Sequence, residues 1–365
     1  MNQTNSESVN KEYGAQMDEL LEITVQEQAS DLHLSINHQP ILRINGRLIP
    51  LVKYKRLVPA ECDGLATSLM TEAQRQRFLR DKDIDFSYSF KEKARFRVNI
   101  FFQRSTVSVA MRLIPAKIRT IEELNLPPIL HAFTEPSQGF VIVTGPSSHG
   151  KSTTMAAMVD EMNHSRAEHI ITIEDPIEYL FQDDKAVIDQ REIYQDSLSF
   201  ARALRATFRQ DPDIIMLGEM RDPETIGTAI TAAETGHLVL ATLHTNSASQ
   251  TIHRIVDSFA PEQQNQIRSQ LSSSLLGVIS QRLVPRLKGG LIPACEVMIA
   301  TPAVANLIRE NKVHELDFVI ETSGELGMIS LNRALANLVK NREISLENAL
   351  NYSLNPNELR RVLRK

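Results

Sequence analysis

The chain has 365 residues, of which 42% are hydrophobic and 23% are charged, and its formal net charge is −5 at pH 7. This composition excludes a disordered or collagen-like chain, and the length predicts about two domains. The slightly acidic balance argues against a dedicated nucleic-acid-binding protein, so no nucleic-acid partner is expected. The cysteines lie far apart without a CxxC partner, which argues against a disulfide framework or a structural zinc site.

The amino-terminal residues 1–16 are polar and lack the apolar core of a signal peptide, so they are expected to form a flexible tail. No apolar run in the sequence reaches the ~18 residues that a membrane-spanning helix needs. We therefore expect a cytoplasmic protein without a membrane span, whose association with a membrane is indirect.

Residues 17–114 have the patterns of a small α+β domain. Apolar positions with helical spacing predict helices around residues 17–29 and 60–79. Short runs with alternating or dense apolar residues, separated by turn residues, predict paired strands. Prolines in the range 115–128 stop any regular element from running through, so this range is predicted to be a linker.

Residues 129–365 follow a different pattern. Short and nearly continuous apolar runs recur, namely GFVIVTG, HIITIED, DIIMLGE and HLVLATL. Segments with helical periodicity separate these runs, and the chain from about residue 302 is mostly helical in character. Apolar strands that alternate with helices indicate a parallel sheet covered on both faces, so the predicted fold class is α/β.

The segment GPSSHGKST fits the phosphate-loop pattern G-x-x-x-x-G-K-[ST]. It follows an apolar strand and opens a helix, where backbone N–H groups and the positive helix end cradle phosphate. This chemistry predicts binding of ATP, with Lys151 at the β- and γ-phosphates and the Ser152 hydroxyl on Mg²⁺. The predicted nucleotide-binding residues of the loop are Gly145, Pro146, Ser147, Ser148, His149, Gly150, Lys151, Ser152 and Thr153.

Two positions inside this loop are unusual. Ser148 stands where many such loops carry a third glycine, and His149 replaces a small residue. If the backbone needs a positive φ at Ser148, the serine adds strain, which the loop is expected to tolerate at the cost of some nucleotide affinity.

Hydrolysis needs a group that orients or deprotonates water. The run DIIMLGE ends in Gly218 and Glu219, where an ordinary Walker B strand ends in Asp-Glu, so Glu219 is the candidate water-activating carboxylate. An ion pair of this acid with Arg221 is the structural alternative. Glu174 and Asp175 follow another apolar run, and the carboxyl ends of parallel strands meet at one sheet edge. One of these two acids is expected near the metal, and capping of the next turn is the alternative.

Two histidines flank the run between residues 237 and 244. Their odd spacing turns the side chains to opposite faces of a strand, so they cannot be twin metal ligands. His244 is predicted at the carboxyl end of the strand, where a γ-phosphate sensor would sit, and is placed among the catalytic residues. His237 is placed among the nucleotide-binding residues. A structural role is the alternative for both histidines.

Together these segments resemble the secretion ATPases of the type II secretion and type IV pilus superfamily, most closely the PilT-like retraction branch. The resemblance runs from about residue 18 to the carboxyl terminus. Its specific blocks are ASDLHLS, RFRVN, GPSSHGKSTT, ITIEDPIEY, IDQRE, LRATFRQDPDIIMLGEMRDPETI and AAETGHLVLATLHTNSA.

The resemblance implies an amino-terminal PAS-like domain, a RecA-like ATPase domain and a hexameric ring, with nucleotide between the two domains. In this family, arginines of the amino-terminal domain reach the phosphates, and the best matches here are Arg97 and Arg112. Both are therefore placed among the catalytic residues, and exposed strand arginines are the alternative.

The resemblance also implies that ATP hydrolysis powers pilus retraction, that is, pilin disassembly and twitching motility. The partner would be an inner-membrane platform protein, which would place the chain peripherally at the inner membrane. The missing four-cysteine metal site and extra amino-terminal domain favour the retraction branch. The segment ELGM is similar to accessory retraction paralogues, so a paralogous retraction ATPase is another expected partner. An extension or secretion ATPase and a weakly active ATP-binding ring subunit are the alternatives.

Overall fold

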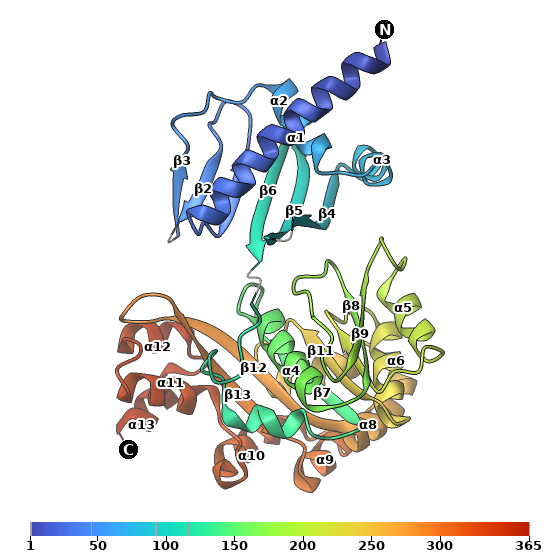
Figure 1. Cartoon of the computed structure of the whole chain (residues 1–365). Coiled ribbons are helices and arrows are strands. Elements are labelled where there is room, and N and C mark those ends of the chain that lie inside the picture. Colours follow the sequence, from blue (N-terminus) through green and yellow to red (C-terminus); the bar gives the residue numbers. More distant parts are fainter. Residues whose placement is uncertain (1, 45, 92, 115–116, 365) are drawn as a thin grey trace. The chain divides into compact units, whose positions relative to one another are not determined.

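The computed structural model of the chain describes residues 2–44, 46–91, 93–114 and 117–364 (Figure 1). Four residues of the predicted tail, linker and second domain lie outside the described residues, namely Met1, Pro115, Ala116 and Lys365. The chain forms two compact units, which comprise Met1–Lys117 with Asp175–Leu180, and Ile118–Glu174 with Phe181–Lys365. In the described ranges, no helix is long and apolar enough to cross a membrane.

The first unit is built on a six-stranded antiparallel sheet with the strand order β3-β2-β1-β6-β5-β4. Its strands are β1 (Asp31–Leu34), β2 (Ile41–Ile44), β3 (Arg47–Pro50), β4 (Asp83–Phe90), β5 (Ala94–Gln103) and β6 (Thr106–Ile114). Its helices are α1 (Asn2–Gln26), α2 (Pro59–Ser68) and α3 (Glu72–Asp81). Figure 1 shows α1 crossing the sheet. Helices and strands share one apolar core, in which Leu20, Leu65 and Val98 are fully buried.

The first helix is longer than the sequence pattern predicts. It begins at Asn2, so the flexible tail expected over residues 1–16 is helical where it is described. Tyr13 packs against the core, and a Cβ atom on Gly64 would lie 2.3 Å from its ring. Because tertiary packing supplies most of a helix's stability, this contact explains helix where the polar sequence predicts a tail.

The single helix predicted over residues 60–79 is in fact two helices, α2 and α3. The Thr71 hydroxyl accepts a hydrogen bond from the Gln74 N–H at 3.3 Å, and Gln74 Oε1 accepts one from the Thr71 N–H at 2.8 Å. This reciprocal capping box starts a new helix at Glu72 and thereby separates it from α2.

The second unit carries a seven-stranded sheet with the order β13-β12-β7-β11-β10-β8-β9. All neighbouring strands are parallel except β12 and β13. The strands are β7 (Gly139–Thr144), β8 (His169–Glu174), β9 (Val187–Glu192), β10 (Ile214–Leu217), β11 (Leu238–Leu243), β12 (Leu275–Pro285) and β13 (Leu291–Ile299). The parallel sheet was predicted, but the sequence patterns did not identify β9, β12 or β13 as strands.

Helices cover this sheet and continue beyond it. They are η1 (Pro128–Phe133), α4 (Lys151–Ser165), α5 (Phe200–Thr207), α6 (Pro223–Glu234), α7 (Ala248–Asp257), α8 (Pro261–Ser274), α9 (Pro302–Arg309), η2 (Val313–Glu315), α10 (Leu316–Thr322), η3 (Gly324–Leu326), α11 (Leu331–Lys340), α12 (Leu346–Tyr352) and α13 (Pro356–Arg364). In β7, Phe140 and Ile142 enter the core beneath α6 and α7, whereas Val141 and Val143 enter the core beneath α4. Burial on both faces explains the continuous apolar runs of the sequence.

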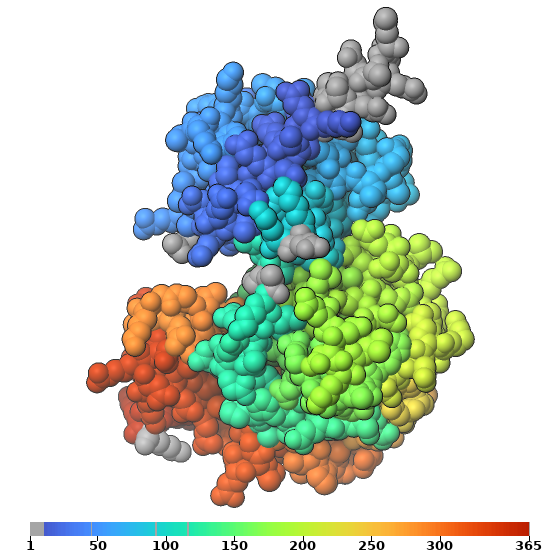
Figure 2. Space-filling model, in the orientation of Figure 1, coloured from blue at the N-terminus to red at the C-terminus, as the bar shows by residue number. Residues whose placement is uncertain are grey.

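The carboxyl-terminal helices pack on the end of the sheet, and their predicted helical character is confirmed. Val284 of β12, Leu335 of α11 and Leu359 of α13 are buried in one shared apolar cluster. Asn348 Nδ2 of α12 also donates to the Pro285 carbonyl at 3.0 Å. In Figure 1 these red helices adjoin the orange strands β12 and β13, and in Figure 2 the red and orange surfaces are contiguous. The carboxyl-terminal helices are thus an integral part of the second unit.

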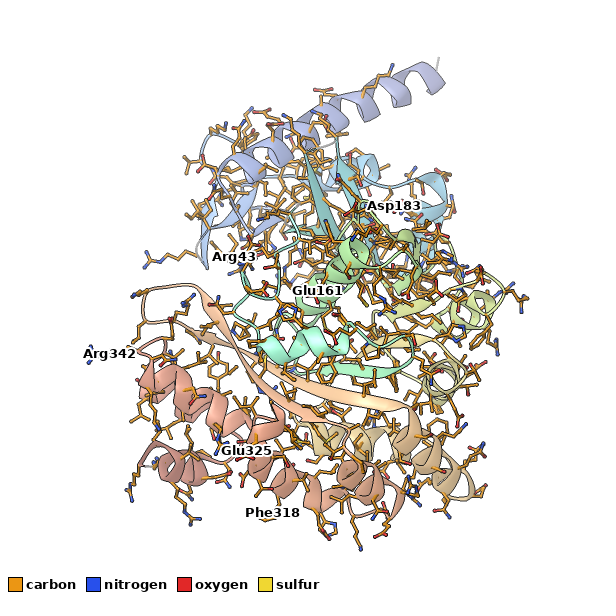
Figure 3. All side chains as sticks on the ribbon, turned by 60° about the horizontal axis from the view of Figure 1, so that its bottom comes forward. Arg43, Glu161, Asp183, Phe318, Glu325 and Arg342 are labelled. Atoms are coloured by element: carbon orange, nitrogen blue, oxygen red, sulfur yellow. The ribbon has the colours of Figure 1, made fainter. Side chains whose placement is uncertain are left out.

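A histidine between two acids joins the segment before β7 to α4. His131 Nδ1 lies 2.8 Å from Glu161 Oε2, and His131 Nε2 lies 2.7 Å from Glu122 Oε1. Glu161, which belongs to α4, is labelled in Figure 3. Burial lowers the pKa of His131, but the hydrogen bonds and charges of Glu161 and Glu122 outweigh this effect and raise the pKa above its usual 6.5. The imidazolium, which donates from both nitrogens, is therefore the favoured partner of these acids.

We predict that His131→Gln removes a stabilising contribution that depends on pH. Because the pKa is raised in the folded chain, the contribution is fully present below the unfolded pKa of about 6.5 and is lost as the pH rises through the folded value. The measurement is the melting temperature of the wild type minus that of the variant, between about pH 5.5 and pH 8.5. This difference should shrink as the pH rises. A difference that stays constant over this range would refute the role of His131.

Candidate nucleotide-binding and hydrolysis site

The predicted phosphate loop lies at the carboxyl edge of the second unit's sheet. It connects the end of β7 at Thr144 to the start of α4 at Lys151, and β7 has β11 and β12 as its neighbours. The first backbone N–H groups of α4, which have no partner within the helix, therefore face the loop. Ser152 in the first turn of α4 is exposed. This is the arrangement in which a helix amino terminus and a hydroxyl can receive phosphate and a divalent cation.

Two glycines of the motif are required by their close approach to Gln281 of β12. Gly145 has a φ of 142°, and a Cβ atom there would lie 2.4 Å from the Gln281 carbonyl oxygen. Gly150 has a φ of 82°, and its Cβ atom would lie 2.9 Å from Gln281 Nε2. Any other residue at these positions would push the loop off β12. Ser148 has a φ of 64°, so the positive φ considered from the sequence is present, at a cost of about 1 kcal/mol.

Gln281 itself is a site residue that the sequence patterns missed. Its side chain is buried and donates from Nε2 to the His149 carbonyl at 2.8 Å. Its Oε1 accepts a hydrogen bond from the Thr154 hydroxyl at 2.7 Å. One buried amide therefore connects the phosphate loop to the first turn of α4. A glutamine in an apolar run carries no motif signal, and its role follows only from the pairing of β12 with β7.

Lys151 lies at the centre of the loop and is buried. Its Nζ donates to the carbonyl oxygens of Gly145 at 2.9 Å and Pro146 at 3.0 Å, and it lies 3.3 Å from His244 Nδ1. Because an ammonium group can only donate, Nδ1 is the acceptor and the proton of His244 is on Nε2. Burial and the charge of Lys151 lower the pKa of His244, which favours this neutral form.

Glu219, the candidate water-activating acid, follows β10 at the same edge. Its side chain is 14% exposed, and Oε2 lies 3.5 Å from His244 Nε2. It also forms an ion pair with Arg221, which is the contact of the structural alternative, and its action on water stays a prediction. Lys151, His244 and Glu219 thus form a continuous line of polar contacts. A change of charge at the loop can therefore alter the electrostatic environment of the Glu219 carboxylate through these contacts.

Glu174 is the last residue of β8, which is the neighbour of β10 in the sheet, and it lies close to Gly218. Glu174 is buried and accepts hydrogen bonds from the Thr172 hydroxyl at 2.7 Å and from Gln190 Nε2 at 3.3 Å. A Cβ atom on Gly218 would lie 3.3 Å from the Ile173 carbonyl oxygen and 3.4 Å from Glu174 Cα. An aspartate at position 218 would therefore press on β8. The neighbouring strand supplies a carboxylate beside Gly218.

Three of the predicted site residues belong to the first unit rather than to the sheet that carries the loop. Asp175 is grouped with that unit although Glu174 belongs to the second. Arg97 forms an ion pair with Asp85 at 2.5 Å and lies 3.4 Å from Glu178. Arg112 and Asp31 form an ion pair at 3.0 Å. The action of Asp175, Arg97 and Arg112 on a nucleotide stays a prediction.

His237 is not brought to the phosphate loop, contrary to the prediction from the sequence. It precedes β11, and its carbonyl accepts a hydrogen bond from the Gly139 N–H at the beginning of β7. Its ring lies 3.0 Å from the Ala232 carbonyl oxygen and forms an edge contact with Phe208. Because the loop follows the other end of β7, the strand direction separates the two sites. The contacts of His237 are therefore those of the structural role that was the alternative for this residue.

Comparison with known proteins identifies the family. A family model described as "Type II/IV secretion system protein" matches residues 7–358. The chain belongs to this family. The type IV pilus retraction ATPase PilT of Pseudomonas aeruginosa is 46% identical over 335 residues, which cover 91% of this chain and 96% of that protein. The type IV pilus ATPase PilU of the same organism is 39% identical over 350 residues, covering 96% of this chain and 91% of that protein.

A solved structure extends the comparison to the fold of this type II/IV secretion system protein. The crystal structure of the pilus retraction motor PilT with bound ADP matches with a TM-score of 0.86 at 45% identity, and covers 94% of this chain and 98% of that chain. The predicted family and fold class are therefore confirmed, with an amino-terminal domain followed by a RecA-like ATPase domain.

Proposed function

We propose that this chain is an ATPase motor whose hydrolysis of ATP powers the retraction of type IV pili. The observation that carries the proposal is the line of contacts from Lys151 through His244 to Glu219 beside a phosphate loop. A loop alone can bind nucleotide, but a carboxylate joined to it by a neutral histidine is suited to hydrolysis. The similar proteins are named for pilus retraction, which supports retraction as the process that this ATPase drives.

The loop and α4 hold the phosphates. The backbone N–H groups of the loop donate to phosphate oxygens, and Lys151 exchanges its two loop carbonyls for the β- and γ-phosphates. The exposed Ser152 hydroxyl and the buried Glu174 carboxylate are oxygen ligands of the kind that Mg²⁺ prefers. When bound, Mg²⁺ neutralises charge on the phosphate oxygens.

Glu219 orients the attacking water and accepts its proton, and Arg221 restrains its carboxylate. When Lys151 turns to the phosphates, His244 Nδ1 loses its hydrogen-bond donor. Because Nε2 of the same ring contacts Glu219, the binding of nucleotide changes the surroundings of that carboxylate. Arg97 and Arg112 stabilise charge that develops on the phosphates. Before nucleotide binds, ion pairs with Asp85 and Asp31 keep Arg97 and Arg112 in place.

The proposed working form is a hexameric ring at the cytoplasmic face of the inner membrane. It would transmit force through a platform protein of the pilus machinery and act beside a paralogous ATPase. The existence of the similar PilU protein in an organism that also has PilT supports the last point.

Deletion of the gene tests the direction of the motor. Retraction predicts cells that carry excess pili and have lost twitching motility. Complementation with the wild-type chain should restore motility, and complementation with Lys151→Ala should not. Loss of surface pili would instead mean that the chain is an extension ATPase. Unchanged pili and motility would contradict a role in the pilus machinery.

A further inference from the structure

Beyond the end of β7, one edge of β12 has no neighbouring strand among the residues that the structure describes. The pairing of β7 with β12 ends at Thr144 opposite Ser280. Three residues further along, Leu283 lies opposite Pro293 of β13, and its N–H is directed to the other side, toward the phosphate loop. Partly buried backbone donors need a partner, and an uncovered strand edge leaves them without one.

His149 supplies that partner. Its Nδ1 accepts the hydrogen bond from the Leu283 N–H at 2.8 Å, while its backbone carbonyl accepts the bond from Gln281 Nε2 at 2.8 Å. The side chain and main chain of one loop residue are thus both bound to β12. Most residues at this position could make the second bond, but a small residue could not reach the Leu283 N–H.

The His149 ring also contacts the carboxyl-terminal helices. Tyr352, the last residue of α12, forms an edge contact with the ring at a centroid distance of 6.2 Å and an interplanar angle of 61°. Helix α12 is itself fixed to β12 through the bond from Asn348 to the Pro285 carbonyl. The ring therefore contacts both β12 and α12, which are also joined to each other.

The hydrogen bond defines the protonation state of this histidine. Because Nδ1 accepts, the ring is neutral and carries its proton on Nε2. The charged groups that face it are Arg282 of β12 and Lys151 of α4, and Tyr352 faces it from α12. Burial, then Arg282, then Lys151 lower the pKa of His149 below its usual 6.5. The acceptor is thus retained at neutral pH.

We propose that His149 is a positioning residue, which fixes the phosphate loop for nucleotide by accepting the Leu283 N–H and is supported by Tyr352. This inference rests on the proposed function, since it concerns the same nucleotide site. The unusual residue at position 149 adds an anchor to the loop, which counteracts the strain at Ser148.

A matched set of variants separates the acceptor from the ring. His149→Asn keeps an oxygen near the position of Nδ1 without the ring, whereas His149→Phe keeps a ring without the acceptor. His149→Leu is a second variant without an acceptor, in case phenylalanine disturbs folding. Circular dichroism melting of each full-length variant shows whether the fold is retained.

The readouts are the equilibrium Kd for ADP and for ATP and the turnover number at saturating ATP. Loss of one hydrogen bond predicts a Kd about 3- to 10-fold higher for the Phe and Leu variants. The Asn variant should raise the Kd less than the Phe and Leu variants do, and each turnover number should fall by a smaller factor than the affinity does. Tyr352→Ala should raise the Kd in the same direction by a smaller factor.

The pH profile provides an independent readout. Protonation of His149 removes the acceptor, so the wild-type Kd for ADP divided by that of His149→Asn should rise as the pH falls through the pKa of His149, which lies below its usual 6.5. A flat ratio, or a Phe variant that binds ADP as tightly as the wild type, would overturn the inference. Failure of the wild type itself to bind or hydrolyse ATP would instead overturn the proposed function.

Discussion

Glu219→Gln should lower the turnover number for ATP by at least about 100-fold, the usual contribution of a general base. Glutamine has nearly the same shape but cannot take the proton of the attacking water. It also weakens the charged contact with Arg221 and the contact with His244 Nε2. Steady-state release of phosphate measures the effect.

Nucleotide binding by this variant should stay within about threefold of the wild type, because Glu219 contacts the loop only through His244. A matched control is Glu224→Gln, which changes an exposed acid that forms an ion pair with Arg205. That control should retain full turnover. If Glu219→Gln also retained it, another carboxylate would activate the water, and Glu174→Gln would become the variant to measure.

Lys151→Ala should raise the Kd for ATP by about 100-fold or more and leave no measurable turnover. The ammonium group donates two hydrogen bonds to loop carbonyls and would donate equivalent charged bonds to phosphate, each worth about 1.5–3 kcal/mol. Binding of a fluorescent ATP analogue by the full-length chain measures this loss. The loss should appear in binding as well as in turnover, unlike the loss caused by Glu219→Gln.

The control for this prediction is Lys185→Ala, which removes an exposed lysine of the same unit. That variant should bind ATP as the wild type does. Retention of wild-type ATP affinity by Lys151→Ala would show that phosphate binds elsewhere, and the loop assignment would fail.

The sequence predicted which polar residues lie together when each of them directly follows an apolar strand. The phosphate loop, Glu219 and Glu174 each follow an apolar run, and a parallel sheet brings such ends to one edge. The sequence also placed His244 at the carboxyl end of its strand and His237 before that strand, so the inclusion of His237 among the nucleotide-binding residues did not follow from this reasoning. Strand direction and the pairing with β7 place His244 beside Lys151 and His237 at the other end.

Contacts between distant segments were beyond the reach of the sequence patterns. Gln281 touches the loop because β12 pairs with β7, and nothing in its local sequence distinguishes it from other polar residues in strands. His149 could be recognised as unusual, but its partner on β12 could not. The ion pairs of Arg97 with Asp85 and of Arg112 with Asp31 likewise depend on the sheet of the first unit.

Two helix boundaries differ from the prediction for different reasons. The capping box at Thr71 was readable in the sequence, yet apolar periodicity suggested a single helix across it. The extension of α1 toward the amino terminus had no local signal, because its support comes from the packing of Tyr13 against the α2 region.

The rate at which the purified full-length chain releases phosphate from ATP in the presence of Mg²⁺ tests the central claim most directly. We predict turnover that saturates with ATP, requires a divalent cation and is lost in both Lys151→Ala and Glu219→Gln. Release no faster than that of Lys151→Ala, from a wild-type chain that is folded and binds ATP, would contradict the claim that this chain is an ATPase motor.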